Sequence, residues 1–140
     1  MMYVVGATNK PWSLDWPFLR RFQKRIYVSL PTQEARESLF KQYTSDLTMS
    51  PRVNSSELAK MFDGYSASDI KDVCQAAHLK TVHELFDSPD YHEPVEGEDP
   101  QKPRELNTAD FRSIMSRRKP SVSTEMVRAY HKWSEEFRAL

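Results

Sequence analysis

Apolar residues recur at three- and four-residue intervals along most of the chain beyond residue 31, which is the pattern of amphipathic helices. The pattern stops at loops and restarts just after small polar residues that can accept hydrogen bonds from the first free amides of a helix. These expected N-caps are Thr32, Asn54, Ser66, Asn107 and Ser123. The sequence therefore predicts five helices in this part of the chain. The first of them runs to about Leu47, and Gly64 ends the second.

Two shorter stretches have the composition of β-strands. Residues 3–5 and 25–30 are rich in β-branched and aromatic side chains, as in parallel strands buried on both faces. Two strands alone do not make a stable sheet, so we expect them to expose apolar surface. We also predict that the chain self-associates, or that its first ~25 residues are disordered, unless a partner covers the strand edges. The predicted fold class is mainly α with two β-strands.

Two segments near the end of the chain have a distinct composition. Residues 88–104 are acidic, contain four prolines and show no hydrophobic period, which favours an exposed loop. An acidic docking segment is the alternative interpretation. In the last expected helix, bulky side chains follow a 4-3-4 spacing: Met126, Tyr130, Trp133 and Phe137. We expect this stripe to clamp onto another part of the fold or onto a neighbouring subunit.

Composition narrows the setting. The 140 residues carry zero formal net charge, which argues against a dominant role in binding nucleic acid or membrane surfaces. The single cysteine, Cys74, excludes an internal disulfide and is consistent with a reducing cytoplasm. Cys74 and His78 are four apart and could share a metal, but a buried thiol beside surface histidines is better supported, because no second pair of ligands exists. No apolar run approaches membrane-spanning length.

Basic residues cluster before the second expected strand. Arg20, Arg21, Lys24 and Arg25 place four cations within six residues. Arginine presents a rigid fork of donors that matches phosphate and carboxylate oxygens two at a time. These residues could bind phosphate, bind a partner's carboxylates or only cover a surface. Asn9 also has two interpretations, because it follows the first strand, where open parallel sheets bind ligands, but could equally begin a turn before Pro11.

Taken in chain order, five segments resemble the second half of the ATPase domain of meiotic-clade AAA proteins. They are Val4–Asn9, Leu14–Asp15, Leu19–Phe22, Arg25–Pro31 and Gly64–Ile70. The clade holds ESCRT-disassembling vacuolar-sorting ATPases, katanin, spastin and fidgetin. Residues 9–12 and the double arginine are most similar to the vacuolar-sorting type, including its archaeal cell-division form. Loop 88–104 is too short for the β domain that eukaryotic sorting ATPases carry there, which also keeps katanin-like and spastin-like proteins in view.

The resemblance implies a division of the chain and a role for particular residues. Residues 1–31 would be the C-terminal part of the large α/β subdomain, residues 32–118 the helical lid, and residues 119–140 a C-terminal helix. Asn9 would orient the attacking water, and Arg20 and Arg21 would be arginine fingers that reach the ATP site of the adjacent subunit. Residues lining the adenine side would be Gly64, Tyr65, Ser66 and Ala67. Ala67 departs from the family, which commonly has glycine there.

The resemblance also implies a larger machine. The sequence has no Gly-x-x-x-x-Gly-Lys-Ser/Thr loop and no acidic strand for magnesium, so we expect this chain to be an inactive piece of a longer enzyme. That parent would bind ATP and magnesium, whereas the piece would hold neither stably. It would form a homo-hexamer in the cytoplasm and act on ESCRT-type filaments, with only indirect membrane association and no nucleic acid. A microtubule-severing ATPase is the first alternative, and a non-catalytic interaction module is the second.

Overall fold

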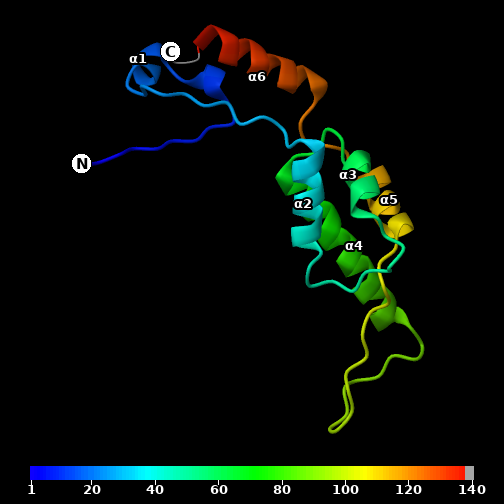
Figure 1. Ribbon diagram of the computed structural model, residues 1–140. Helices are drawn as coiled ribbons and strands as arrows, with labels where there is room; N and C mark the ends of the chain where they lie inside the picture. The colour runs from blue at the N-terminus through cyan, green and yellow to red at the C-terminus, as the bar shows by residue number, and fades with distance from the viewer. Residues whose placement is uncertain (138–140) are drawn as a thin grey trace. The chain divides into compact units, whose positions relative to one another are not determined.

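The computed structural model describes residues 1–137 of the chain, and it is mainly helical, as predicted. Its elements, in chain order, are η1 (Pro11–Ser13), α1 (Trp16–Leu19), α2 (Gln33–Tyr43), α3 (Ser55–Met61), α4 (Ala67–Asp87), α5 (Thr108–Arg117) and α6 (Thr124–Phe137). They form two compact units (Figure 1). One contains residues 30–122, and the other contains residues 1–29 together with α6. None of the described helices is long and apolar enough to cross a membrane.

Residues 30–122 form a helical bundle around one apolar core. α2 packs against α3 and α4, and α4 packs against α5. Phe40 lies at the centre, with its ring 5.1 Å from that of Phe111 and 6.0 Å from that of Phe62. Aromatic pairs at these separations add about 0.5–1.5 kcal/mol each beyond the area they bury. The helical stripes identified in the sequence therefore converge on a common interior.

The expected helix caps are confirmed. The Thr32 side chain accepts a hydrogen bond from the amide of Ala35, and the Asn54 side chain accepts from Ser56 and Glu57. Reciprocal capping boxes begin two helices, α4 at Ser66 and α5 at Asn107. Substituting such a cap with alanine costs about 1 kcal/mol, so these side chains position the helix starts.

The end of α2 differs from the expectation. The helix stops at Tyr43 rather than near Leu47, and Thr44 is its C-cap. The Thr44 hydroxyl donates to the Phe40 carbonyl at 2.7 Å, and the Leu47 amide donates to the Thr44 carbonyl, so a turn replaces the next helical residues. Leu47 nevertheless packs against the core. The apolar period therefore marked a buried residue correctly and extended the helix too far.

The other unit is built around the aromatic stripe of α6. The Tyr130 ring lies 5.1 Å from Trp12 and 6.1 Å from Tyr27, and Phe137 lies 6.1 Å from Trp16. The stripe thus clamps onto another part of the fold, one of its two expected targets. The last turn of α6 is also held, because Arg25 Nη1 donates to the Phe137 carbonyl at 2.6 Å.

The two predicted strands do not form among the described residues. Segments 3–5 and 25–30 have no strand structure, and Tyr3, Val4, Val5, Ile26 and Val28 are exposed. A strand is defined by hydrogen bonds to a neighbouring strand, and these segments have none to pair with. The composition indicated β-structure that the chain does not complete. The expected exposure of apolar surface at both segments is confirmed.

Candidate functional site

The segment expected to line the adenine side connects α3 to α4. Gly64 has φ of +83°, a left-handed conformation that favours glycine, and it turns the chain after α3. Tyr65 then enters the core, and its ring packs edge-on against Phe62 at 5.4 Å. Ser66 is the N-cap of α4, and Ala67 is its first residue. The structure thus presents Gly64, Ser66 and Ala67 at the partly exposed N-terminal end of a long helix.

Two contacts from the α5–α6 connector hold this segment. The Tyr65 hydroxyl donates to the Arg118 carbonyl at 2.8 Å. Asp69 Oδ2 accepts three hydrogen bonds, from the amide of Ser66 at 3.1 Å and from the amide and hydroxyl of Ser121 at 3.1 and 3.0 Å. Side chains at the first turn of α4 therefore tie residues 64–67 to the connector.

The electrostatics favour this arrangement. Burial alone would raise the pKa of Asp69, but the hydrogen bonds from Ser121 and Ser66 outweigh it and lower the pKa. Burial, together with the Asp69 charge, raises the pKa of Tyr65, so the phenol remains a donor at neutral pH. The Asp69 carboxylate also lies near the positive end of the α4 dipole, where a negative charge is favoured. This helix start is thus already neutralised by a residue of its own.

Sequence reasoning missed the connector's share in this site. The spacing of Ser66 and Asp69 predicted a cap, which the structure confirms. Nothing in the sequence indicated that Ser121, fifty-two positions later, would meet the same carboxylate oxygen. That contact depends on α5 folding back along α4, which is a tertiary event.

Asn9, Arg20 and Arg21 lie in the other unit. All three are exposed, and the Asn9 carbonyl accepts a hydrogen bond from the Tyr130 hydroxyl at 2.6 Å. Arg20 is the C-cap of α1, and the Arg21 amide donates to the Phe18 carbonyl. Within residues 1–137, neither guanidinium makes a hydrogen bond or an ion pair. The structure thus presents two adjacent cations on a short helical turn, free to engage an anion. It does not join them in one compact unit with residues 64–67.

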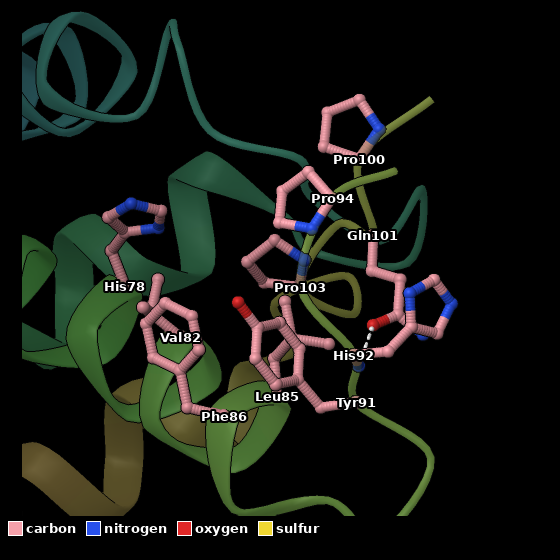
Figure 2. Close-up of a pocket in the computed structure, with 10 residues that line it drawn as sticks. All are labelled: His78, Val82, Leu85, Phe86, Tyr91, His92, Pro94, Pro100, Gln101 and Pro103. Atoms are coloured by element: carbon pink, nitrogen blue, oxygen red, sulfur yellow. Dashed lines mark hydrogen bonds between the residues drawn. The ribbon is translucent and has the colours of Figure 1, made fainter. Parts of the chain in front are cut away.

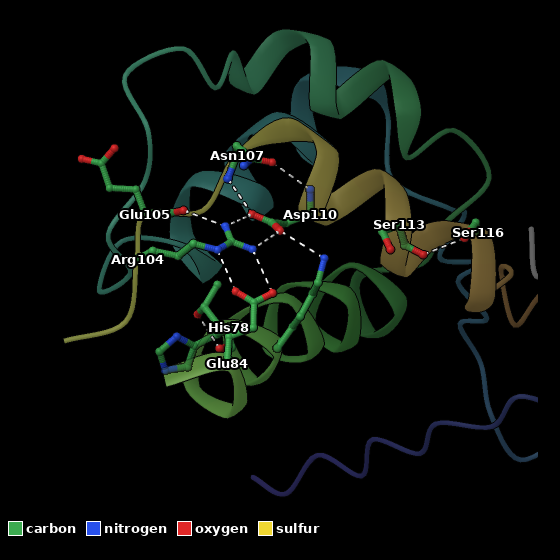
Figure 3. Close-up of polar contacts among 10 residues, drawn as sticks. His78, Glu84, Arg104, Glu105, Asn107, Asp110, Ser113 and Ser116 are labelled. Atoms are coloured by element: carbon green, nitrogen blue, oxygen red, sulfur yellow. Dashed lines mark hydrogen bonds and ion pairs between the residues drawn. The ribbon is translucent and has the colours of Figure 1, made fainter. Parts of the chain in front are cut away.

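An ion network that the sequence did not indicate joins α4, α5 and the segment before α5 (Figure 3). Arg104 bonds Asp110 at 2.7 and 2.8 Å and Glu84 at 2.8 and 3.2 Å. Lys80 approaches Asp110 at 3.3 Å. The Arg104 guanidinium holds the pKa of Asp110 well below its usual range, and it also lowers the pKa of Glu84. The network anchors the chain where it enters α5.

Cys74 is a core residue. It is buried within the helical bundle, and burial raises the pKa of its thiol to about 12. Among residues 1–137, no group of three or more histidine, cysteine or acidic side chains is arranged to hold a metal ion. Cys74 thus behaves as a small apolar side chain.

Comparisons with known proteins place the chain in one family. A family model described as "AAA+ lid domain" matches residues 52–96, which include α3, α4 and the segment between them. Cell division protein C of Sulfolobus acidocaldarius is 52% identical over 139 residues, covering 99% of this chain and 34% of that protein. A katanin p60-like ATPase of Homo sapiens is 33% identical over 139 residues, covering 98% of this chain and 28% of that protein.

Two further matches agree. Spastin of Danio rerio is 38% identical over 135 residues, covering 96% of this chain and 23% of that protein. The crystal structure of the FIGL-1 AAA domain with ADP superposes with a TM-score of 0.80 and 28% identity, covering 96% of this chain and 44% of that one. The chain spans about a third or less of the length of these curated relatives. Because the similarity extends along nearly the whole chain and includes the helical lid, the chain belongs to the AAA ATPase family, in the branch that holds katanin, spastin and FIGL-1.

Proposed function

We propose that this chain is part of a homo-hexameric AAA ATPase that uses ATP hydrolysis to disassemble or remodel ESCRT-type filaments in cell division or membrane scission. The observation that carries the proposal is the 52% identity to Cell division protein C over 99% of the chain. The katanin and spastin matches extend nearly as far along the chain but at lower identity. Cellular location follows from the same reasoning, and we infer the cytoplasm, with membrane contact only through the filament and no role for nucleic acid.

In this proposal, Arg20 and Arg21 are arginine fingers that complete the ATP site of the neighbouring subunit. The γ-phosphoryl transition state spreads negative charge over its oxygens, and an arginine supplied by a neighbour accelerates the reaction by about 10³–10⁵-fold. The exposed, unpaired guanidinium groups on the turn after α1 support this role, because a finger must be free to enter another subunit. Asn9 would orient the attacking water. ATP and magnesium would be held mainly by residues outside this chain.

Residues Gly64 to Ala67 would contact the adenine side of the nucleotide in the same subunit. Partial exposure of Gly64, Ser66 and Ala67 leaves their backbone accessible, and the ties from Tyr65 and Asp69 keep it in one conformation. A contact surface that is already ordered loses less entropy on binding. This chain by itself would be inactive, because the phosphate loop and the magnesium site are not in its sequence.

The decisive experiment is a chimera in which this chain replaces the matching region of Sulfolobus acidocaldarius Cell division protein C. We expect ATP turnover in the chimera and a loss of at least about 10³-fold on Arg20→Ala or Arg21→Ala, with nucleotide binding retained. Lys24→Ala is the matched control, since Lys24 is an exposed cation in the same stretch. Mixing finger variants with magnesium-site variants should partly restore turnover. Unchanged turnover in both arginine variants would refute the finger assignment.

A microtubule-severing ATPase is the second candidate, favoured by the katanin and spastin matches. The two candidates differ in substrate, so the active chimera should be offered preassembled ESCRT-type filaments and stabilised microtubules side by side. Filament disassembly without microtubule severing supports the first proposal. Severing of microtubules alone would replace it with the second.

A further inference from the structure

The acidic loop 88–104 and the end of α4 enclose a cleft that the proposed ATPase role does not use. Its volume is about 380 Å³, within the range of about 300–1,000 Å³ typical of binding pockets. The lining is mostly apolar, as Figure 2 shows: Val82, Leu85, Phe86, Tyr91, Pro94 and Pro103 are among its residues. Phe86 is 55% exposed even though it packs edge-on against Tyr91 at 5.0 Å. A large aromatic ring is therefore presented to an occupant.

The loop is held in this shape by its own polar contacts. Gln101 Nε2 donates to the Asp90 carbonyl at 3.1 Å, and its Oε1 accepts from the His92 amide at 3.1 Å (Figure 2). One side chain thus joins the two ends of the excursion. Arg104 anchors the exit of the loop to Glu84 on α4. Prolines restrict the backbone between these points, so the cleft is ordered before any partner arrives.

The rim of the cleft carries a concentrated negative charge. Six exposed carboxylates and no lysine or arginine occupy residues 87–99, in a chain whose formal net charge is zero: Asp87, Asp90, Glu93, Glu96, Glu98 and Asp99. Within the part of the chain that the structure describes, none of the six forms an ion pair. The C-terminal end of the α4 dipole adds partial negative charge, and no basic residue lies in its last turn.

We propose that this cleft is a docking site for a basic peptide segment of a partner protein. The segment would insert one bulky apolar or aromatic side chain against Phe86 and Tyr91, and its arginines or lysines would face the rim carboxylates. Charge complementarity selects the occupant, because six unpaired carboxylates repel acidic segments and attract cationic ones toward the cleft. Arginine can also stack on exposed aromatic faces. The proposal does not depend on the ATPase role.

The test uses the chain itself and a short fluorescein-labelled peptide of alternating arginine and glycine with one central phenylalanine. We expect saturable binding by fluorescence anisotropy that weakens as salt is added, because the rim charges are exposed. Replacing the peptide's phenylalanine with alanine, or its arginines with glutamates, should abolish measurable binding. Equal binding of the arginine and glutamate peptides would overturn the proposal.

Variants of the chain separate the apolar cleft from its charged rim. Phe86→Ala should weaken binding at least about tenfold, as removal of an aromatic anchor does. Leu79→Ala is its control, since Leu79 is about as exposed on the same helix but does not line the cleft. Combined Glu96→Gln, Glu98→Gln and Asp99→Asn should weaken binding and flatten its salt dependence.

A control for the charge variant removes three exposed acids elsewhere, through Glu34→Gln, Asp46→Asn and Glu125→Gln. If both triple variants lose the same affinity, the effect is general electrostatics and the proposal fails. Circular dichroism of each variant shows that the helices persist. Sedimentation of the free chain tests another occupant, since a dimer that Phe86→Ala dissociates would assign the cleft to a second copy and overturn the peptide assignment.

Discussion

Replacing Arg104 with alanine should destabilise residues 30–122 far more than its exposed position suggests. The Arg104 side chain is 42% exposed, yet its partner Asp110 is only 3% exposed. Removal of the guanidinium therefore leaves a buried carboxylate with Lys80 at 3.3 Å and the Asn107 amide at 2.9 Å as its remaining partners. The cost arises from Asp110, which cannot recover its lost hydrogen bonds from water.

The magnitude follows from the geometry. Removing one partner of a fully buried ion pair costs about 3–5 kcal/mol, whereas an exposed pair is worth about 0–1 kcal/mol. Here one partner is buried, the other is half exposed, and Lys80 still neutralises part of the charge, so we expect a loss of about 2 kcal/mol. In a domain of this size, that lowers the melting temperature by about 10 °C. Glu84→Gln should cost less than about 1 kcal/mol, because both members of that pair are exposed.

Urea unfolding followed by two signals gives a clean assay. Most helical residues lie in α2–α5, so circular dichroism reports mainly on residues 30–122. All three tryptophans lie in the other unit, at positions 12, 16 and 133, so tryptophan fluorescence reports on that one. Arg104→Ala should shift the dichroism transition to lower urea with little change in the fluorescence transition.

Lys102→Ala is the matched control, because Lys102 is an exposed cation of the same loop. It should change the free energy of unfolding by less than about 0.5 kcal/mol. If Arg104→Ala and Lys102→Ala cost the same, Asp110 does not depend on the guanidinium and the reasoning is wrong. A shift confined to tryptophan fluorescence would contradict it as well.

Four further predictions address single features. The pKa of Asp110 is lowered on folding, so the unfolded chain binds more protons, and lowering the pH from about 5 toward 2 should reduce the free energy of unfolding less in Asp110→Asn than in the parent chain. Cys74, with its thiol pKa raised to about 12, should react with iodoacetamide only as residues 30–122 open, and a rate like that of free cysteine would contradict this. Gly64→Ala should cost about 1–2 kcal/mol in the urea assay from backbone strain alone, because no atom lies within 4 Å of the added methyl. Tyr130→Phe should lose the bond to the Asn9 carbonyl and destabilise its unit by about 1 kcal/mol by tryptophan fluorescence, and Tyr130→Ala should cost more because the ring contacts are lost too.

The helices and their starts were predictable because their causes are local. Thr32, Asn54 and Ser66 accept hydrogen bonds from amides two or three residues away, so spacing along the chain suffices to find them. Gly64 likewise marks a backbone conformation that its own residue type favours. The roles expected for Asn9, Arg20 and Arg21 rest on family resemblance and stay predictions, because they concern atoms of a nucleotide and of a neighbouring subunit.

Tertiary structure alone decided the rest. Arg104, Glu84 and Asp110 are ordinary surface charges in the sequence, and only the packing of α5 on α4 buries one of them and makes the other two its partners. Ser121 reaches Asp69 for the same reason. Residues 3–5 and 25–30 show the converse, since their composition favours strands but a strand exists only when another supplies its hydrogen bonds. Local propensity and capping act within a few residues, whereas ion pairs, cleft walls and sheets depend on which distant segments the fold brings together.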